Sequence, residues 1–222
     1  EETPHFQAAQ RDAAPERAPI FEILSNHLGL VLAGAGGVVA TFALFYLSTS
    51  FALALGVGSI GFQRETFLVL QLCASLFYAG AIFLSGVLCD RIGQRRVLAG
   101  GAIATIAVGL FFEAGLRSGS IGVAGVTLCA AMFALGFANG PLGAWLATLF
   151  PVRERYTGVS IAFNLGGILG GAFVPFIAQL FVVQGASDGT LILLLIAGLS
   201  TLAGIAFSGR KAARSLQTGQ ST

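Results

Sequence analysis

Residues 66–89, TFLVLQLCASLFYAGAIFLSGVLC, contain no charged side chain, and residues 90–96, DRIGQRR, follow them directly. About 20 apolar residues in a helix are enough to cross the hydrocarbon core of a bilayer. Further charge-free stretches occupy 28–55, 97–112, 118–152, 156–187 and 189–209. The chain is only 10% charged, against about 25% in soluble domains. The sequence therefore predicts an all-α integral membrane protein with six transmembrane helices; the strand alternation of a membrane barrel is missing.

The charged residues outside these stretches predict the orientation of the chain. Residues 1–26 form a polar lead, 27–210 the transmembrane region and 211–222 a basic tail that we expect to be disordered. If six helices alternate in direction, ten Lys and Arg residues fall on one side of the membrane and two on the other. Basic residues in short loops favour the cytoplasm. We expect both termini to be cytoplasmic, in a plasma or bacterial inner membrane. The start at Glu1, with no signal-like segment after it, indicates a cut within a longer chain or a processed end.

The stretch GVLCDRIGQRRVL (residues 86–98) lies between the second and third apolar runs and is the most charged part of the chain's interior. A basic loop that only fixes topology would explain its arginines. It would not require Asp90 between Gly86 and Gly93. An aspartate at a helix end can accept hydrogen bonds from arginines or from free backbone amides.

Two motifs make the sequence similar to the major facilitator superfamily. Residues 86–96 resemble its G-x-L-x-D-R-x-G-R-R signature, with Gln94 where an arginine is common. Residues 149–171, LFPVRERYTGVSIAFNLGGILGG, resemble a loop and helix of its metabolite:proton symporter family. The matching residues there are Phe150, Pro151, Arg155, Tyr156, Thr157, Gly158 and Asn164. Thr148 stands where family members often have a glutamate, and Glu154 is an alternative carboxylate.

The resemblance covers about residues 22–210 and implies one half of a twelve-helix transporter, built from inverted three-helix repeats. The chain resembles the C-terminal half, which would pair with an N-terminal six-helix half on the same or a separate chain. The implied function is proton-coupled symport of a small organic acid or zwitterion by alternating access. The residues implied to close the cytoplasmic side are Gly86, Asp90, Arg91, Gly93, Arg95, Arg153 and Arg155. In this scheme Asp90 is the central acceptor, Arg91 and Arg95 are donors, and the glycines allow close approach.

Polar side chains within the apolar runs are candidates for the substrate pathway. By resemblance, the first and fourth helices line that pathway, with the second and fifth beside it. The candidates are Tyr46, Thr49, Gln71, Asn139 and Asn164. Each needs a hydrogen-bond partner, which is either a neighbouring helix or a bound solute. The sequence does not distinguish whether Trp145 packs in the core, lies at the membrane interface or forms a platform for a ligand.

Titratable groups are scarce in the apolar runs. Glu113 lies near the outer end of the third run, and Arg117 at i+4 predicts a salt bridge rather than a proton carrier. His27 is interpreted as an interface residue, and the cysteines as packing residues. Because no convincing proton-binding group remains, we expect the coupling carboxylates in the other half.

Glycine and proline positions predict how the helices pack. In NLGGILGGAFVP (residues 164–175), glycines recur four residues apart in two registers, a spacing that permits close helix approach. Pro141 lies within the fourth run and predicts a kink, which would be tolerated beside a cavity.

Two other classes of function were weighed. An intramembrane serine protease needs an activated nucleophile, yet the only histidines, His5 and His27, lie outside the membrane interior. The sequence therefore predicts a protein that is not an enzyme, with no catalytic residue, metal site, cofactor or nucleic-acid partner. A non-transporting scaffold or sensor derived from a transporter remains an alternative. A flux assay would distinguish it from a transporter.

Overall fold

The computed structural model describes residues 23, 25–152, 154–185 and 188–219, with side chains placed up to residue 209. This part of the chain is helical and contains no strand. Its elements are α3 (Leu28–Tyr46), η1 (Leu47–Phe51), η2 (Ala54–Ile60), α4 (Arg64–Ile92), α5 (Gln94–Gly109), α6 (Phe112–Arg117), α7 (Ile121–Ala147), α8 (Arg155–Gly167), η3 (Ile168–Phe173), α9 (Val174–Val183) and α10 (Gly189–Gly219), where η denotes a π-helical segment. The predicted all-α class is confirmed.

Five helical segments are long and apolar enough to cross a membrane. They are Leu28–Ile60, Arg64–Ile92, Ile121–Ala147, Arg155–Val183 and Gly189–Gly209. The predicted third crossing, 97–112, is not one continuous helix. α5 has 16 residues and ends at Gly109, and α6 begins only at Phe112. Tight i→i−3 backbone bonds at Leu110 and Phe111 separate the two helices. The count of six crossings therefore stays a prediction.

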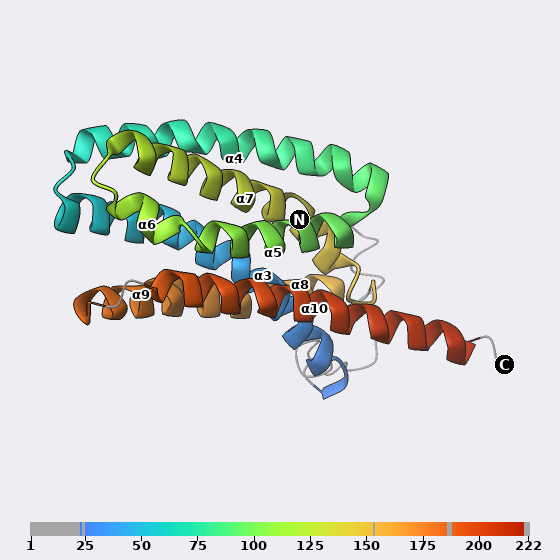
Figure 1. Cartoon of the computed structure of the whole chain (residues 1–222). Helices are drawn as coiled ribbons and strands as arrows, with labels where there is room; N and C mark the ends of the chain where they lie inside the picture. The colour runs from blue at the N-terminus through green and yellow to red at the C-terminus, as the bar shows by residue number, and fades with distance from the viewer. Residues whose placement is uncertain (1–22, 24, 153, 186–187, 220–222) are drawn as a thin grey trace, which may run out of the picture.

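Successive segments run in opposite directions (Figure 1). The α4–α5 turn and the start of α8 lie at one end of the bundle, whereas α6 and the far end of α9 lie at the other. α7 packs between α4 and α5, and α10 packs between α5 and α3. α3 also contacts α8. The alternation agrees with the scheme from which we counted basic residues on the two sides.

Burial differs sharply between the spans. The most apolar window of Leu28–Ile60 is 56% buried, and so is that of Ile121–Ala147, whereas the window of Arg64–Ile92 is only 17% buried and that of Arg155–Val183 22% buried. Leu28–Ile60 and Ile121–Ala147 therefore form the core of the described bundle. Arg64–Ile92 and Arg155–Val183 leave most of their apolar surface uncovered by the described residues.

The charged stretch at residues 86–98 is not a loop. α4 continues to Ile92, Gly93 adopts φ +87°, and α5 begins at Gln94. This φ is in the left-handed range, where glycine has no steric penalty. Asp90 and Arg91 therefore lie in the last turn of α4, and Arg95 and Arg96 in the first turn of α5. We call residues 90–96 the basic turn.

Two further boundaries differ from the sequence predictions. α10 continues to Gly219, so the prediction that the tail from residue 210 is disordered was wrong for the described residues. The first span continues to Ile60 rather than 55, and its last part is π-helical. Pro141 is buried inside α7, which stays one helix from Ile121 to Ala147.

The glycine registers of residues 164–175 pack in two different ways. A Cβ added to Gly166 would lie 2.5 Å from the carbonyl oxygen of Ala35, and one added to Gly170 would lie 3.0 Å from the amide nitrogen of Ala43. This register brings α8 and η3 against the backbone of α3, as the spacing predicts. Gly167 and Gly171 instead face aromatic rings of α3. The fully buried ring of Trp145 similarly covers Gly37, which identifies it as a packing residue.

Candidate functional site

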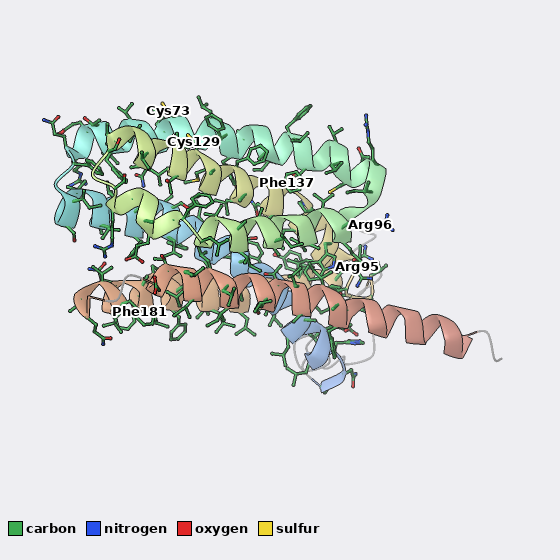
Figure 2. All side chains as sticks on the ribbon, in the orientation of Figure 1. Cys73, Arg95, Arg96, Cys129, Phe137 and Phe181 are labelled. Atoms are coloured by element: carbon green, nitrogen blue, oxygen red, sulfur yellow. The ribbon has the colours of Figure 1, made fainter. Side chains whose placement is uncertain are left out.

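The basic turn lies at one end of the bundle, where Arg95 and Arg96 begin α5 (Figure 2). Arg95 extends across to α10: its Nη2 donates a hydrogen bond to the carbonyl oxygen of Ile205 at 2.5 Å. The guanidinium also occupies the space that a side chain on Gly209 would need. Arg95 therefore ties the start of α5 to α10.

Asp90, the predicted central acceptor, is exposed at the end of α4. Within the described part of the chain, the two ion pairs are His27–Glu154 and Arg117–Glu113, and neither includes Asp90. Gly86 is also exposed, and nothing lies within 4 Å of the position that its Cβ would take. A contact made by these two residues would have to come from outside the described residues.

The start of α8 holds the second group of predicted gating residues. Arg155 is exposed, and Arg153 lies outside the described residues. Glu154 is buried, and its Oε2 lies 3.4 Å from Nε2 of His27, just before α3. Thr148 follows the last residue of α7, and its hydroxyl donates to the carbonyl oxygen of Trp145 in that helix at 2.6 Å, so it makes no contact that replaces the missing carboxylate. Glu154 thus joins α8 to the start of α3 rather than to the basic turn.

Gln71 stabilises the π-helical end of the first span. Its Nε2 donates to the carbonyl oxygens of Ser48 and Thr49 in η1, at 3.0 and 2.8 Å. The Thr49 hydroxyl donates to the carbonyl oxygen of Phe45 at 2.7 Å. A π-helical turn is an irregularity often found at functional sites. Two of the pathway candidates therefore take part in hydrogen bonds that hold this turn.

Asn139 contacts a residue that the sequence analysis did not single out. Its Nδ2 lies 2.6 Å from the hydroxyl of Tyr78, which joins α7 to α4. Gly136, one turn earlier, lies against the backbone of the same part of α4. The pair is a hydrogen bond between helices, one of the two roles considered for Asn139.

Tyr46 and Asn164 are the two pathway candidates that come together. They line one groove of about 320 Å³ between α3 and the α8–η3 segment. The groove is lined by Phe42, Tyr46, Phe163, Asn164, Gly167, Ile168, Gly171 and Ala172. We call it the aromatic groove. The i, i+4 spacing of Phe42 with Tyr46 was an unused sequence signal for this site, and that of Gly167 with Gly171 predicted close helix packing only.

Glu113 forms the predicted salt bridge with Arg117, with Oε1 and Nε 2.9 Å apart. Its other oxygen accepts a hydrogen bond from the hydroxyl of Thr190 in α10, also at 2.9 Å. The carboxylate is 5% exposed and both its oxygens have partners. It therefore links α6 to α10 close to the break after α5.

All three cysteines are free, and the described residues contain no cluster of three or more His, Cys, Asp or Glu side chains able to hold a metal ion. Cys73 and Cys129 lie on the neighbouring helices α4 and α7 (Figure 2).

Comparison with known proteins identifies the chain's relatives. The inner membrane metabolite transport protein YhjE of Escherichia coli is 28% identical over 91% of the chain and 47% of its own length. The shikimate transporter of the same organism is 28% identical over 85% of the chain and 42% of its own length. A citrate-proton symporter of Klebsiella pneumoniae is 28% identical over 82% of the chain and 41% of its own length. A proline/betaine transporter of Salmonella typhimurium is 23% identical over 85% of the chain and 39% of its own length. No protein-family model and no solved structure matches the chain.

These relatives are metabolite transporters of the major facilitator type, and they confirm the resemblance drawn from the two sequence motifs. The chain is homologous to this group of transporters. It spans about half the length of the curated relatives that it matches.

Proposed function

We propose that the chain forms the C-terminal half of a secondary active transporter that carries a small organic acid or zwitterion by proton-coupled symport. The observation that carries this proposal is the match to an inner membrane metabolite transport protein over 91% of the chain. Five apolar membrane-length helices support it. The remaining helices would come from an N-terminal half, and the whole protein would lie in the plasma or inner membrane with both termini of this chain cytoplasmic.

The basic turn would act at the cytoplasmic face in this proposal. Asp90 and Gly86 are exposed on α4, which this chain leaves largely uncovered. In the state closed to the cytoplasm, they would contact the N-terminal half. Arg95 would hold the turn in place through its bond to α10. Alternating access would then break and remake the contacts of Asp90 while Arg95 keeps its position.

Proton coupling would rely on groups outside this half. Of the two buried carboxylates among the described residues, Glu113 is held by Arg117 and Thr190. Glu154 lies 3.4 Å from His27, a contact that is an ion pair only when the imidazole is protonated. A group that must gain and lose a proton during transport is poorly served by a fixed salt bridge. A symporter relative that carries citrate with protons makes this coupling the expectation for the complete transporter.

Uptake of labelled solutes by membrane vesicles tests the proposal. Vesicles from cells that produce the transporter should accumulate citrate, shikimate or betaine, and a protonophore should abolish accumulation. An antibody against residues 210–222 should detect a band near twice 22.8 kDa in native membranes if both halves are on one chain. A band near 22.8 kDa would require two separate chains. Failure to accumulate any of the three solutes would contradict a transporter of this substrate class and favour the scaffold.

A further inference from the structure

The aromatic groove is built by side chains that fit one another across two helices. A Cβ on Gly167 would lie 3.3 Å from the ring of Phe42, and one on Gly171 would lie 2.7 Å from the ring of Tyr46. The missing side chains therefore make room for the two rings. Phe163 adds a third ring, 5.1 Å from that of Phe42 in an edge-to-face arrangement at 71°. The π-helical segment η3 forms part of the wall.

The polar groups of the groove, the Tyr46 hydroxyl and the Asn164 amide, carry no charge and can each accept or donate a hydrogen bond. The Nδ2 of Asn164 donates to the carbonyl oxygen of Ser160 at 2.8 Å, so its amide hydrogens are partly used within α8. Its Oδ1 has no hydrogen-bond donor, and the Tyr46 hydroxyl no partner, among the residues described. No Lys, Arg, Asp or Glu lines the groove.

This composition discriminates between the two ends of a zwitterion. A carboxylate taken out of water needs a cation or several donors. The groove has no cation, and its donors are the Tyr46 hydroxyl and the second N–H of the Asn164 amide. An ammonium group is attracted to the negative faces of aromatic rings, and this attraction is used by sites that bind quaternary ammonium ligands. The volume of about 320 Å³ is at the lower end of ligand pockets, which suits a small solute.

We propose that the aromatic groove binds the ammonium end of a small zwitterion, preferably one with an N-methylated or ring nitrogen. This inference rests on the proposed transport function and narrows it: the substrate is a zwitterion rather than an organic acid of purely negative charge. Phe42, Tyr46 and Phe163 surround the cation. The carboxylate end is bound by groups outside the groove.

Competition for uptake in vesicles containing the complete transporter tests the inference. The probes are labelled betaine, citrate and shikimate, with unlabelled tert-butylacetate as a competitor. That compound has the shape and carboxylate of betaine, with carbon in place of the positively charged nitrogen. We expect betaine to be accumulated and tert-butylacetate to compete poorly with it. Phe42→Leu and Phe163→Leu should each raise the KM for betaine roughly two- to thirty-fold, which corresponds to the loss of one cation–π contact.

Phe133→Leu is the matched control. It removes one ring from the Phe133–Phe137 pair on α7, which does not line the groove, and should leave the KM for betaine unchanged. Accumulation of citrate or shikimate without inhibition by betaine would overturn the ammonium site and leave the transport function standing. Equal competition by tert-butylacetate and betaine would also overturn the site. No accumulation of any probe would refute the transport function, and the inference with it.

Discussion

Replacing Gly86 by alanine separates packing within this chain from contact with a second half. Gly86 lies on the exposed side of α4, and a Cβ there would have no neighbour within 4 Å. The same is true of Gly80 on the same helix, which makes Gly80→Ala the matched control. Alanine in a helix interior is about 0.5–1 kcal/mol more favourable than glycine. Both variants should therefore be as stable as the unmodified protein, or slightly more stable.

Transport should distinguish the two variants. If the cytoplasmic side closes by bringing another helix against Gly86, a methyl group inserted there costs about 1–3 kcal/mol. If this cost applies only to the state closed to the cytoplasm, the equilibrium between the closed and open states shifts roughly 5- to 150-fold toward the open state. Gly86→Ala should then slow solute uptake, whereas Gly80→Ala should not.

The measurement combines initial uptake rates in vesicles with thermal unfolding of the purified transporter in detergent, followed by circular dichroism. The reasoning holds if Gly86→Ala lowers uptake while its unfolding temperature does not fall. If Gly86→Ala and Gly80→Ala transport equally well, the predicted role of Gly86 in closure is refuted. If the unfolding temperature falls for Gly86→Ala but not for Gly80→Ala, the space beside Gly86 is occupied by another part of the protein and is not open.

Three further substitutions test other parts of the structure. Asp90→Asn should reduce uptake because it removes the negative charge of the basic turn and so weakens its hydrogen bonds to cationic donors. Glu65→Gln, at an exposed carboxylate at the opposite end of the same helix, should not. Equal uptake by both variants would contradict the gating role. Thr190→Val should lower the free energy of unfolding by about 1.5–3 kcal/mol, because it removes a hydrogen bond to the buried carboxylate of Glu113. An unchanged unfolding temperature would show that this hydrogen bond contributes nothing to stability. Gly170→Ala should destabilise by about 1–3 kcal/mol because the added methyl group meets the backbone of α3, whereas Gly143→Ala on α7, with open space around it, should not.

Hydropathy predicted most of the fold because the membrane imposes one simple requirement on each crossing. Runs of apolar residues fix where helices lie, and backbone hydrogen bonds must then be satisfied within them. The break at Leu110 and Phe111 could not be predicted in this way, because both residues are apolar and belong to the run 97–112. The break lies beside Glu113, whose partner Thr190 is 77 residues away in the sequence.

The π-helical end of the first span was also beyond sequence reasoning. A run such as LSTSFALALGVGSI has the same composition in an α-helix and in a π-helix. The distinction involves Gln71, which bonds to two carbonyl oxygens of η1 from the neighbouring helix. In the sequence Gln71 is one polar residue in an apolar run, so its importance could be suspected but its partner could not be identified.

The candidate site was predicted in part for the same reason. Polarity within apolar runs singled out Tyr46 and Asn164, which do line one groove. The residues that give this groove its chemistry, Phe42 and Phe163, were indistinguishable from the other phenylalanines of the chain until the helices were placed. Glycine spacing alone indicated close packing, and only the structure shows that one register contacts backbone and the other contacts rings.

The distribution of burial connects the two functional surfaces. Gly86 and Asp90 lie on Arg64–Ile92, and Phe163 and Asn164 lie on Arg155–Val183; these spans are the two least buried by the rest of the described chain. Apolar surface exposed to lipid tails carries no penalty, so exposure alone requires no partner. A groove with unpaired oxygens is different, because lipid tails cannot satisfy them. A second half that covered both surfaces would bring the closing contact and the ammonium site under the control of one movement, which is the coupling that alternating access requires.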